Sequence, residues 1–189
     1  GIRILDRHGR VRGLEAVAYA WREMKHVPDT ALWEKPQGKN PPLKMEKKFT
    51  IVPRGVALVI ACSTFPTWNG YPGIFASLVT GNPVIVKAHP TVILPLAISV
   101  AVARAVLSEA GFDPNLVSLL IDDPAAPVAK EVAMNPEVRL IDYTGGPAFG
   151  NWLEANCRHA MVYTEKAGVN CIVVDSIDDY KAMLKNLAF

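Results

Sequence analysis

The sequence predicts an α/β fold with a largely parallel sheet and helices on both faces, and three observations support this prediction. From residue 51 onward, short apolar runs alternate with longer segments of helical spacing. The short runs are apolar on both faces, which is typical of strands buried in a parallel sheet. The chain has 189 residues, of which 50% are hydrophobic and 20% charged, enough to bury a core in one large domain or two small ones.

The first 50 residues differ from the rest in charge. They hold 11 lysines and arginines against 6 acidic residues, whereas the remaining residues hold 9 against 12. Apolar residues at helical spacing predict a helix over residues 14–24. Prolines and a glycine between residues 28 and 42 then predict an irregular linker. We therefore divide the chain into an N-terminal helix with a basic, proline-rich linker, residues 1–50, and an α/β domain, residues 51–189.

Strands and helices alternate through the α/β domain. Short apolar runs predict strands at residues 55–61, 83–87, 116–121, 138–143, 161–163 and 171–174. Helical spacing predicts helices at residues 91–111, 125–134, 147–156 and 180–187. Gly111 fits just past the end of the first helix, Pro147 opens the third, and residues 176–179 cap the last. This alternation favours parallel strands joined by crossover helices.

Charge and cysteine content exclude several classes of protein. The formal net charge of +2 is too small for a protein that binds nucleic acid by charge alone. The basic cluster at residues 44–48 either attracts an anionic partner or forms a solvated charged loop. Cys62, Cys157 and Cys171 form no C-x-x-C pair, so we expect neither a disulfide framework nor a metal site. This usage indicates a reducing, cytoplasmic setting.

We expect no membrane segment and no signal peptide. The longest apolar stretch, residues 92–103, contains Pro95 and is too short to span a bilayer. Residues 1–4 lead directly into charged residues, unlike a secretory signal. The sequence has no initiator methionine, so we expect a fragment of a longer protein.

Candidate site residues should follow strands, because ligands of open α/β sheets bind at the carboxyl ends of the strands. Thr144, Gly145 and Gly146 lie between a strand and a helix start, and Gly150 follows one turn later. Paired glycines let the backbone approach a phosphate, and a helix N-terminus favours an anion. The spacing is neither the G-x-G-x-x-G fingerprint nor a P-loop, and an ordinary tight turn explains the same residues.

Two further places follow the first two strands of the domain. Lys87 ends an apolar strand, where its ammonium either reaches a ribose hydroxyl or a phosphate, or meets solvent. An ordinary turn packed by Phe65 and Trp68 is one interpretation of residues 62–70. The other is a ligand loop, because the segment is rich in small polar donors, among them Cys62, Ser63, Thr64 and Asn69.

The fourth place is Glu165, between two apolar strands. A carboxylate at a strand end serves as a general base when its pKa is tuned to the reaction. A solvated loop acid is the alternative. The four histidines show no metal-ligand spacing, and the sequence offers no clear Ser-His-Asp set.

Taken in order, these motifs resemble the coenzyme-binding part of the aldehyde dehydrogenase superfamily, over residues 52–189. Residues 54–56, R-G-V, are similar to the family's P-x-G-V, and residues 80–87, T-G-N-P-V-I-V-K, to its G-N-x-V-x-x-K strand. Residues 108–114, S-E-A-G-F-D-P, resemble the family's E-A-G turn, and residues 143–146, Y-T-G-G, resemble its F-T-G-S turn. Thr164, Glu165 and Asn170 resemble its E-L-G-G-K-N/S segment. Residues 61–68 and 165–170 look closest to the phenylacetate-degradation branch, which oxidises the aldehyde formed when an oxepin-CoA ring opens.

The resemblance implies a Rossmann-like fold and a role for each candidate residue. Lys87 would bind the adenosine ribose of NAD or NADP, and the other coenzyme contacts would be Cys62, Ser63, Thr144, Gly145, Gly146 and Gly150. Glu165 would activate the water that hydrolyses the thioester intermediate. Thr64 aligns with the family's oxyanion-stabilising asparagine, and Asn69 stands five residues later. The substrate would be an aldehyde, and the complete enzyme would be a homo-oligomer.

Two departures from the family pattern have consequences. Pro90 stands where the family often has a glutamate that holds the ribose diol. Loss of that carboxylate removes a repulsion against a 2′-phosphate, which admits NADP beside NAD. The family's nucleophilic cysteine lies further beyond the base than the 24 residues that follow Glu165 here, and none of the three cysteines matches it. We therefore expect half an active site, and no aldehyde turnover by this chain alone.

Two other functions agree with the same residues. One is a nucleotide-binding module without catalysis. The other is a structural fragment that binds no ligand, since a missing domain would normally cover part of the sheet edge. Saturable binding of NAD or NADP separates these two.

Overall fold

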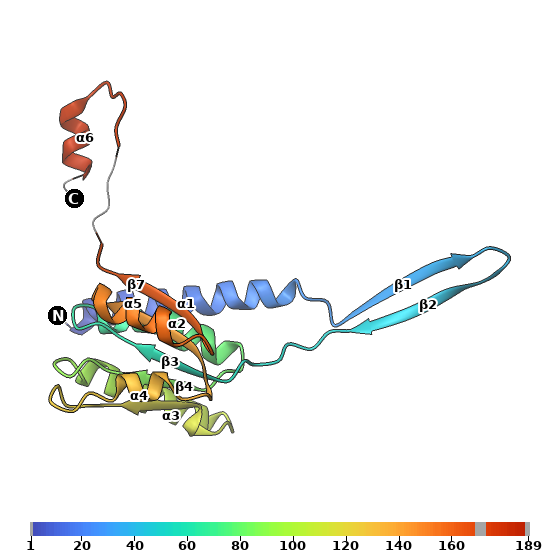
Figure 1. Ribbon diagram of the computed structural model, residues 1–189, viewed down its shortest axis with the longest axis horizontal. Helices are drawn as coiled ribbons and strands as arrows, with labels where there is room; N and C mark the ends of the chain where they lie inside the picture. Colours follow the sequence, from blue (N-terminus) through green and yellow to red (C-terminus); the bar gives the residue numbers. More distant parts are fainter. Residues whose placement is uncertain (1, 169–172, 188–189) are drawn as a thin grey trace.

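The computed structural model describes residues 2–168 and 173–187, and it confirms the predicted α/β fold (Figure 1). Its main sheet is parallel, with strands in the order β5-β4-β3-β6-β7. These strands are β3 (Val56–Ile60), β4 (Val84–Lys87), β5 (Val117–Leu120), β6 (Val138–Gly145) and β7 (Met161–Lys166). After β3, the strands β4 and β5 lie on one side of it, and β6 and β7 then lie on the other side. A crevice therefore opens between the carboxyl ends of β3 and β6.

Helices cover both faces of this sheet, as predicted. One face carries α2 (Pro66–Val79) and α3 (Leu94–Glu109), and the other carries α4 (Ala129–Ala133) and α5 (Pro147–Asn156). Neighbouring residues of β3 point to two separate cores. Val59 packs in the core that contains Ile74 of α2, whereas Leu58 packs in the core that contains Leu153 of α5. Both faces of β3 are thus buried, which explains its unbroken apolar sequence.

Most predicted boundaries in the α/β domain hold. The helix α5 spans the predicted residues, α3 begins three residues later than predicted, and α4 is shorter. Gly111 adopts a left-handed conformation (φ 78°) just past the end of α3. Asp179 caps α6 (Tyr180–Leu187) by accepting a hydrogen bond from the amide of Ala182.

Two predictions in this domain need correction. The segment 62–70 is not wholly a loop, because α2 begins at Pro66, which fits the first turn of a helix. The predicted strand at 171–174 lies partly outside the described residues, and Val173 and Val174 belong to no strand.

The predicted irregular linker is wrong, because most of it forms a two-stranded antiparallel hairpin, β1 (Thr30–Gln37) and β2 (Asn40–Lys48). Figure 1 shows this hairpin extending away from the sheet. Its turn uses Gly38 at φ 64°. Each strand of the hairpin has one edge that pairs with no other strand, and a proline on that edge interrupts no hydrogen bond between the strands. The pairing register shifts between Lys35 and Gln37, which flank Pro36.

The N-terminal helix α1 (Ile2–Lys25) is longer than predicted and lies along α2. The predicted apolar face is only partly correct, because Leu14 and Trp21 are 64% and 54% exposed. A small residue makes the contact instead: a Cβ at Gly13 would stand 2.8 Å from the ring of Phe75. No helix in the described part of the chain is long and apolar enough to cross a membrane.

Candidate functional site

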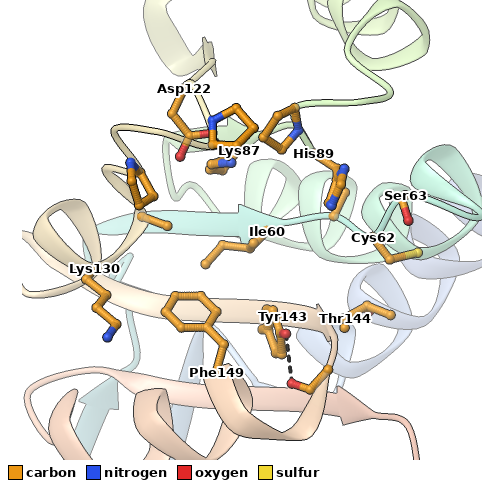
Figure 2. A pocket seen from close by; sticks show the side chains of 17 residues that line it. Ile60, Cys62, Ser63, Lys87, His89, Asp122, Lys130, Tyr143, Thr144 and Phe149 are labelled. Atoms are coloured by element: carbon orange, nitrogen blue, oxygen red, sulfur yellow. Dashed lines mark hydrogen bonds and ion pairs between the residues drawn. The ribbon is translucent and has the colours of Figure 1, made fainter.

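The carboxyl ends of β3, β4, β5 and β6 surround one cavity of about 560 Å³ (Figure 2). Phe149 of α5 and Lys130 of α4 complete its walls. Six sequence-predicted candidates line this cavity: Cys62, Ser63, Lys87, Thr144, Gly145 and Gly146. They come from three separate strand ends, so the parallel sheet brings them together as expected.

Lys87 does not meet solvent at its strand end. Its side chain is 7% exposed, and its Nζ lies 2.5 Å from Oδ1 of Asp122, whose side chain is 3% exposed. Nζ also donates to the carbonyl of Ala88 at 2.9 Å. The second carboxylate oxygen of Asp122 accepts a hydrogen bond from the amide of Val128 at 3.2 Å. The structure therefore fixes a buried ion pair in the cavity wall.

Sequence reasoning misses Asp122. The residue follows β5 almost directly, so it carries the same signal as Lys87: a charged residue at the carboxyl end of a buried strand. What the sequence does not reveal is that β4 and β5 are neighbours, which places residues 35 positions apart in contact.

The glycine turn after β6 leads into the N-terminus of α5. A side chain at Gly145 would collide with the phenol of Tyr143, whereas one at Gly146 would meet nothing within 4 Å. Tyr143 donates its hydroxyl hydrogen to the carbonyl of Gly146 at 2.9 Å, and burial raises the pKa of this phenol. The turn therefore presents bare backbone and the positive end of a helix to the cavity.

Gly150 does not line the cavity. It is buried one turn into α5, where a Cβ would stand 2.6 Å from Cδ of Lys166. Its role in the structure is to let α5 approach β7.

Glu165 joins two other predicted residues beside the cavity. The β6–β7 register places it opposite Thr144. Its Oε2 accepts a hydrogen bond from Nδ2 of Asn69 at 3.2 Å and from Oγ1 of Thr144 at 3.5 Å. Three elements, α2, β6 and β7, thus converge on one exposed carboxylate. Among the described residues, no hydrogen bond joins Thr64 to Glu165, and the hydroxyl of Thr64 lies 3.5 Å from Sγ of Cys62.

The cysteines with described positions differ in environment. Cys157 is fully buried, its Sγ lies 4.0 Å from Sδ of Met134, and burial raises the pKa of its thiol. A thiol in that environment is a poor nucleophile. Cys62 is partly buried in the cavity wall, and Cys171 lies outside the described residues. Residues 2–168 and 173–187 contain no group of three or more His, Cys, Asp or Glu side chains that could hold a metal.

Comparison with known proteins identifies relatives of this chain. A family model described as "Aldehyde dehydrogenase family" matches residues 10–189. The structure is similar to that of an NAD-dependent aldehyde dehydrogenase from Burkholderia multivorans, with 61% identity and a TM-score of 0.85 over 96% of this chain and 33% of that one. A search among curated proteins found no match.

Two more distant structures share the fold. Glyceraldehyde-3-phosphate dehydrogenase GapN from Methanocaldococcus jannaschii, solved with NADP, is 18% identical with a TM-score of 0.64, covering 86% of this chain and 34% of that one. The aldehyde dehydrogenase KauB from Pseudomonas aeruginosa is 21% identical with a TM-score of 0.61, covering 84% and 30%. The chain therefore spans about a third of the length of these structures.

Proposed function

The chain belongs to the aldehyde dehydrogenase family, and from that premise we propose that its cavity binds NAD or NADP for the oxidation of an aldehyde to the acid. The observation that carries the proposal is the convergence of Lys87, the Gly145–Gly146 turn and the start of α5 on one cavity. Its volume of about 560 Å³ suits a small-molecule site. The Burkholderia relative named NAD-dependent supports the coenzyme class.

The residues of the cavity would bind and orient the coenzyme, whose nicotinamide accepts the hydride when bound. Two of the three N–H groups of Lys87 are used by Asp122 and Ala88, which leaves one for a ribose hydroxyl. Gly145, Gly146 and the start of α5 would face the pyrophosphate, because backbone there is open and the helix end is positive.

Glu165 would act as the general base that takes a proton from water. Asn69 and Thr144 both donate to its Oε2, which holds the carboxylate in one orientation. A carboxylate that accepts hydrogen bonds stays available as a proton acceptor at its other oxygen. Thr64 and Asn69 are the two candidates for stabilising the oxyanion, and Asn69 is already engaged with Glu165.

The rest of the machinery would come from outside this chain. Neither Cys62 nor Cys157 matches the sequence position of the family's nucleophilic cysteine, so we propose that this chain alone binds coenzyme without turning over aldehyde. The substrate we propose is a CoA-linked semialdehyde of phenylacetate degradation, on the resemblance of residues 61–68 and 165–170 to that branch. We further propose a cytoplasmic homo-oligomer.

A pair of glycine variants tests coenzyme binding. Gly146→Val adds a side chain to open space in the cavity wall, so we expect it to fold and to weaken NAD binding at least tenfold. Gly168→Val also adds a side chain to open space, at a residue that does not line the cavity, and it should bind like the unaltered chain. Fluorescence of Trp152 can report binding, since its ring stacks on that of Phe149 in the cavity wall. No saturable change with either coenzyme would refute the proposal.

A further inference from the structure

We propose that Asp122 makes this site select NAD over NADP, an inference that rests on the proposed function. The two coenzymes differ in one group, the phosphate on the 2′-hydroxyl of the adenosine ribose. Discrimination therefore depends on the charges that surround that ribose. The buried charges that would lie beside the ribose are those of Lys87 and Asp122, at the ends of β4 and β5.

The lysine that would hold the ribose has no spare charge for a phosphate. Lys87 and Asp122 form an ion pair at 2.5 Å, with both side chains less than a tenth exposed. The pair is neutral as a unit. A 2′-phosphate placed beside it would meet the negative charge of Asp122 as well as the positive charge of Lys87, and it would lose hydration on entering a partly buried site.

Asp122 is held firmly in the wall of the cavity. Its Oδ2 accepts a hydrogen bond from the amide of Val128, which anchors the carboxylate against the chain that follows β5. Figure 2 shows Asp122 and Lys87 together on one wall of the cavity. In dinucleotide-binding folds an acidic residue accepts hydrogen bonds from the ribose hydroxyls of NAD, whereas an arginine accommodates the 2′-phosphate of NADP. Here the acidic residue follows β5, and among the described side chains no arginine lines the cavity.

The other charged residue of the cavity does not offset this arrangement. Lys130 lies on the opposite wall from Asp122 (Figure 2), with its ammonium 4.9 Å from the ring centroid of Trp152. His89 uses Nδ1 to accept a hydrogen bond from the amide of Thr91, so this nitrogen is turned toward Thr91. Pro90 stands where the family often has a glutamate, so the carboxylate that lines this cavity is that of Asp122.

Calorimetric titration of the unaltered chain with NAD⁺ and NADP⁺ tests the inference. We expect NAD⁺ to bind at least tenfold more tightly. Asp122→Asn keeps the size of the side chain and removes its charge, so the ratio of the two Kd values should fall below threefold, mainly through tighter NADP⁺ binding. Asp123→Asn is the matched control: it removes the same charge from an exposed neighbour outside the cavity, and it should leave the ratio unchanged.

Asp122→Asn leaves the buried Lys87 without its charged partner, which by itself can alter the site. A second comparison therefore uses the unaltered chain. Binding of 5′-AMP and of 2′,5′-ADP to the unaltered chain isolates the effect of the 2′-phosphate, and 5′-AMP should bind more tightly. Equal binding of NAD⁺ and NADP⁺, or an unchanged ratio in a folded Asp122→Asn variant, would overturn the inference while the proposed function stands. Absence of binding by both coenzymes would overturn the proposed function and the inference with it.

Discussion

Among single residues, Asp142 links burial to the pH dependence of stability. Its strand β6 lies inside the sheet, and the carboxylate presses on α2, where a Cβ at Gly73 would lie 2.5 Å from Oδ2. Burial first, and then the negative charge of Glu165, raise the pKa of Asp142 from 3.8 to about 6. The folded state thus binds this proton more tightly than the unfolded state does. Protonated Asp142 therefore stabilises the folded state at low pH, and this stabilisation is lost as the pH rises from 3.8 through about 6.

Asp142→Asn should therefore stabilise the protein at neutral pH. The amide has nearly the same size and cannot ionise, so it avoids burying a charge. We expect a gain of up to about 3 kcal/mol at pH 7 and a much smaller gain at pH 4. Urea unfolding at both pH values measures the difference. A gain of equal size at both values would show that ionisation of Asp142 is not the cause.

The site residues divide into those that the sequence reveals and those that it hides. Lys87 and Glu165 are predicted because each follows an apolar strand. Asp122 is missed, because its importance depends on burial and on a neighbour distant in the sequence. The same reason hides Asp142, which does not line the cavity. A charged residue after a strand is visible in the sequence, but the strand order that gives it a partner is not.

Among the elements, α3 carries an apolar stripe that the described structure leaves uncovered. Leu94, Ile98, Val102 and Val106 recur every four residues, and each is between 56% and 69% exposed. Three residues of this stripe, Ile98, Val102 and Val106, also line an apolar cavity of about 620 Å³ shared with α1 and α2. Contiguous apolar surface of this kind is typical of an interface. The stripe supports the proposed homo-oligomer.

A charge on this stripe should reduce self-association. Val102→Asp places a carboxylate in the middle of the stripe. Because Val102 is already 58% exposed, we expect little loss of stability. Phe112→Asp is the control, because Phe112 is equally exposed but lies beyond the end of α3. Light scattering after gel filtration gives the mass. A monomeric unaltered chain, or an oligomer that Val102→Asp leaves intact, would contradict the proposed use of this stripe.

Some elements could not be predicted because their local signals conflict. The helix α2 contains Gly70, Pro72 and Gly73, which favour a loop, but packing of Ile74 beneath the sheet stabilises the helix. The hairpin contains prolines that argue against strands, yet its two strands pair only with each other and tolerate them. By contrast, α5 and β3 have consistent local patterns and were predictable.

For the whole molecule, the order of the strands decides where a ligand can bind. Alternating strands and helices predict a parallel sheet, but they do not reveal on which side of β3 each later strand is added. The structure places β4 and β5 on one side and β6 and β7 on the other. This reversal opens the cavity between the ends of β3 and β6, and it brings Lys87, Asp122 and the Gly145–Gly146 turn around one space.

The central claim is that the carboxyl edge of this sheet binds the coenzyme. Chemical-shift mapping of backbone amides during an NAD⁺ titration tests this claim most directly. We predict saturable shifts at Ser63, Lys87 and Gly146, and none at Gly55 and Arg139, which lie at the amino ends of the strands. Shifts confined to the amino ends, or no shifts at any concentration, would contradict the claim.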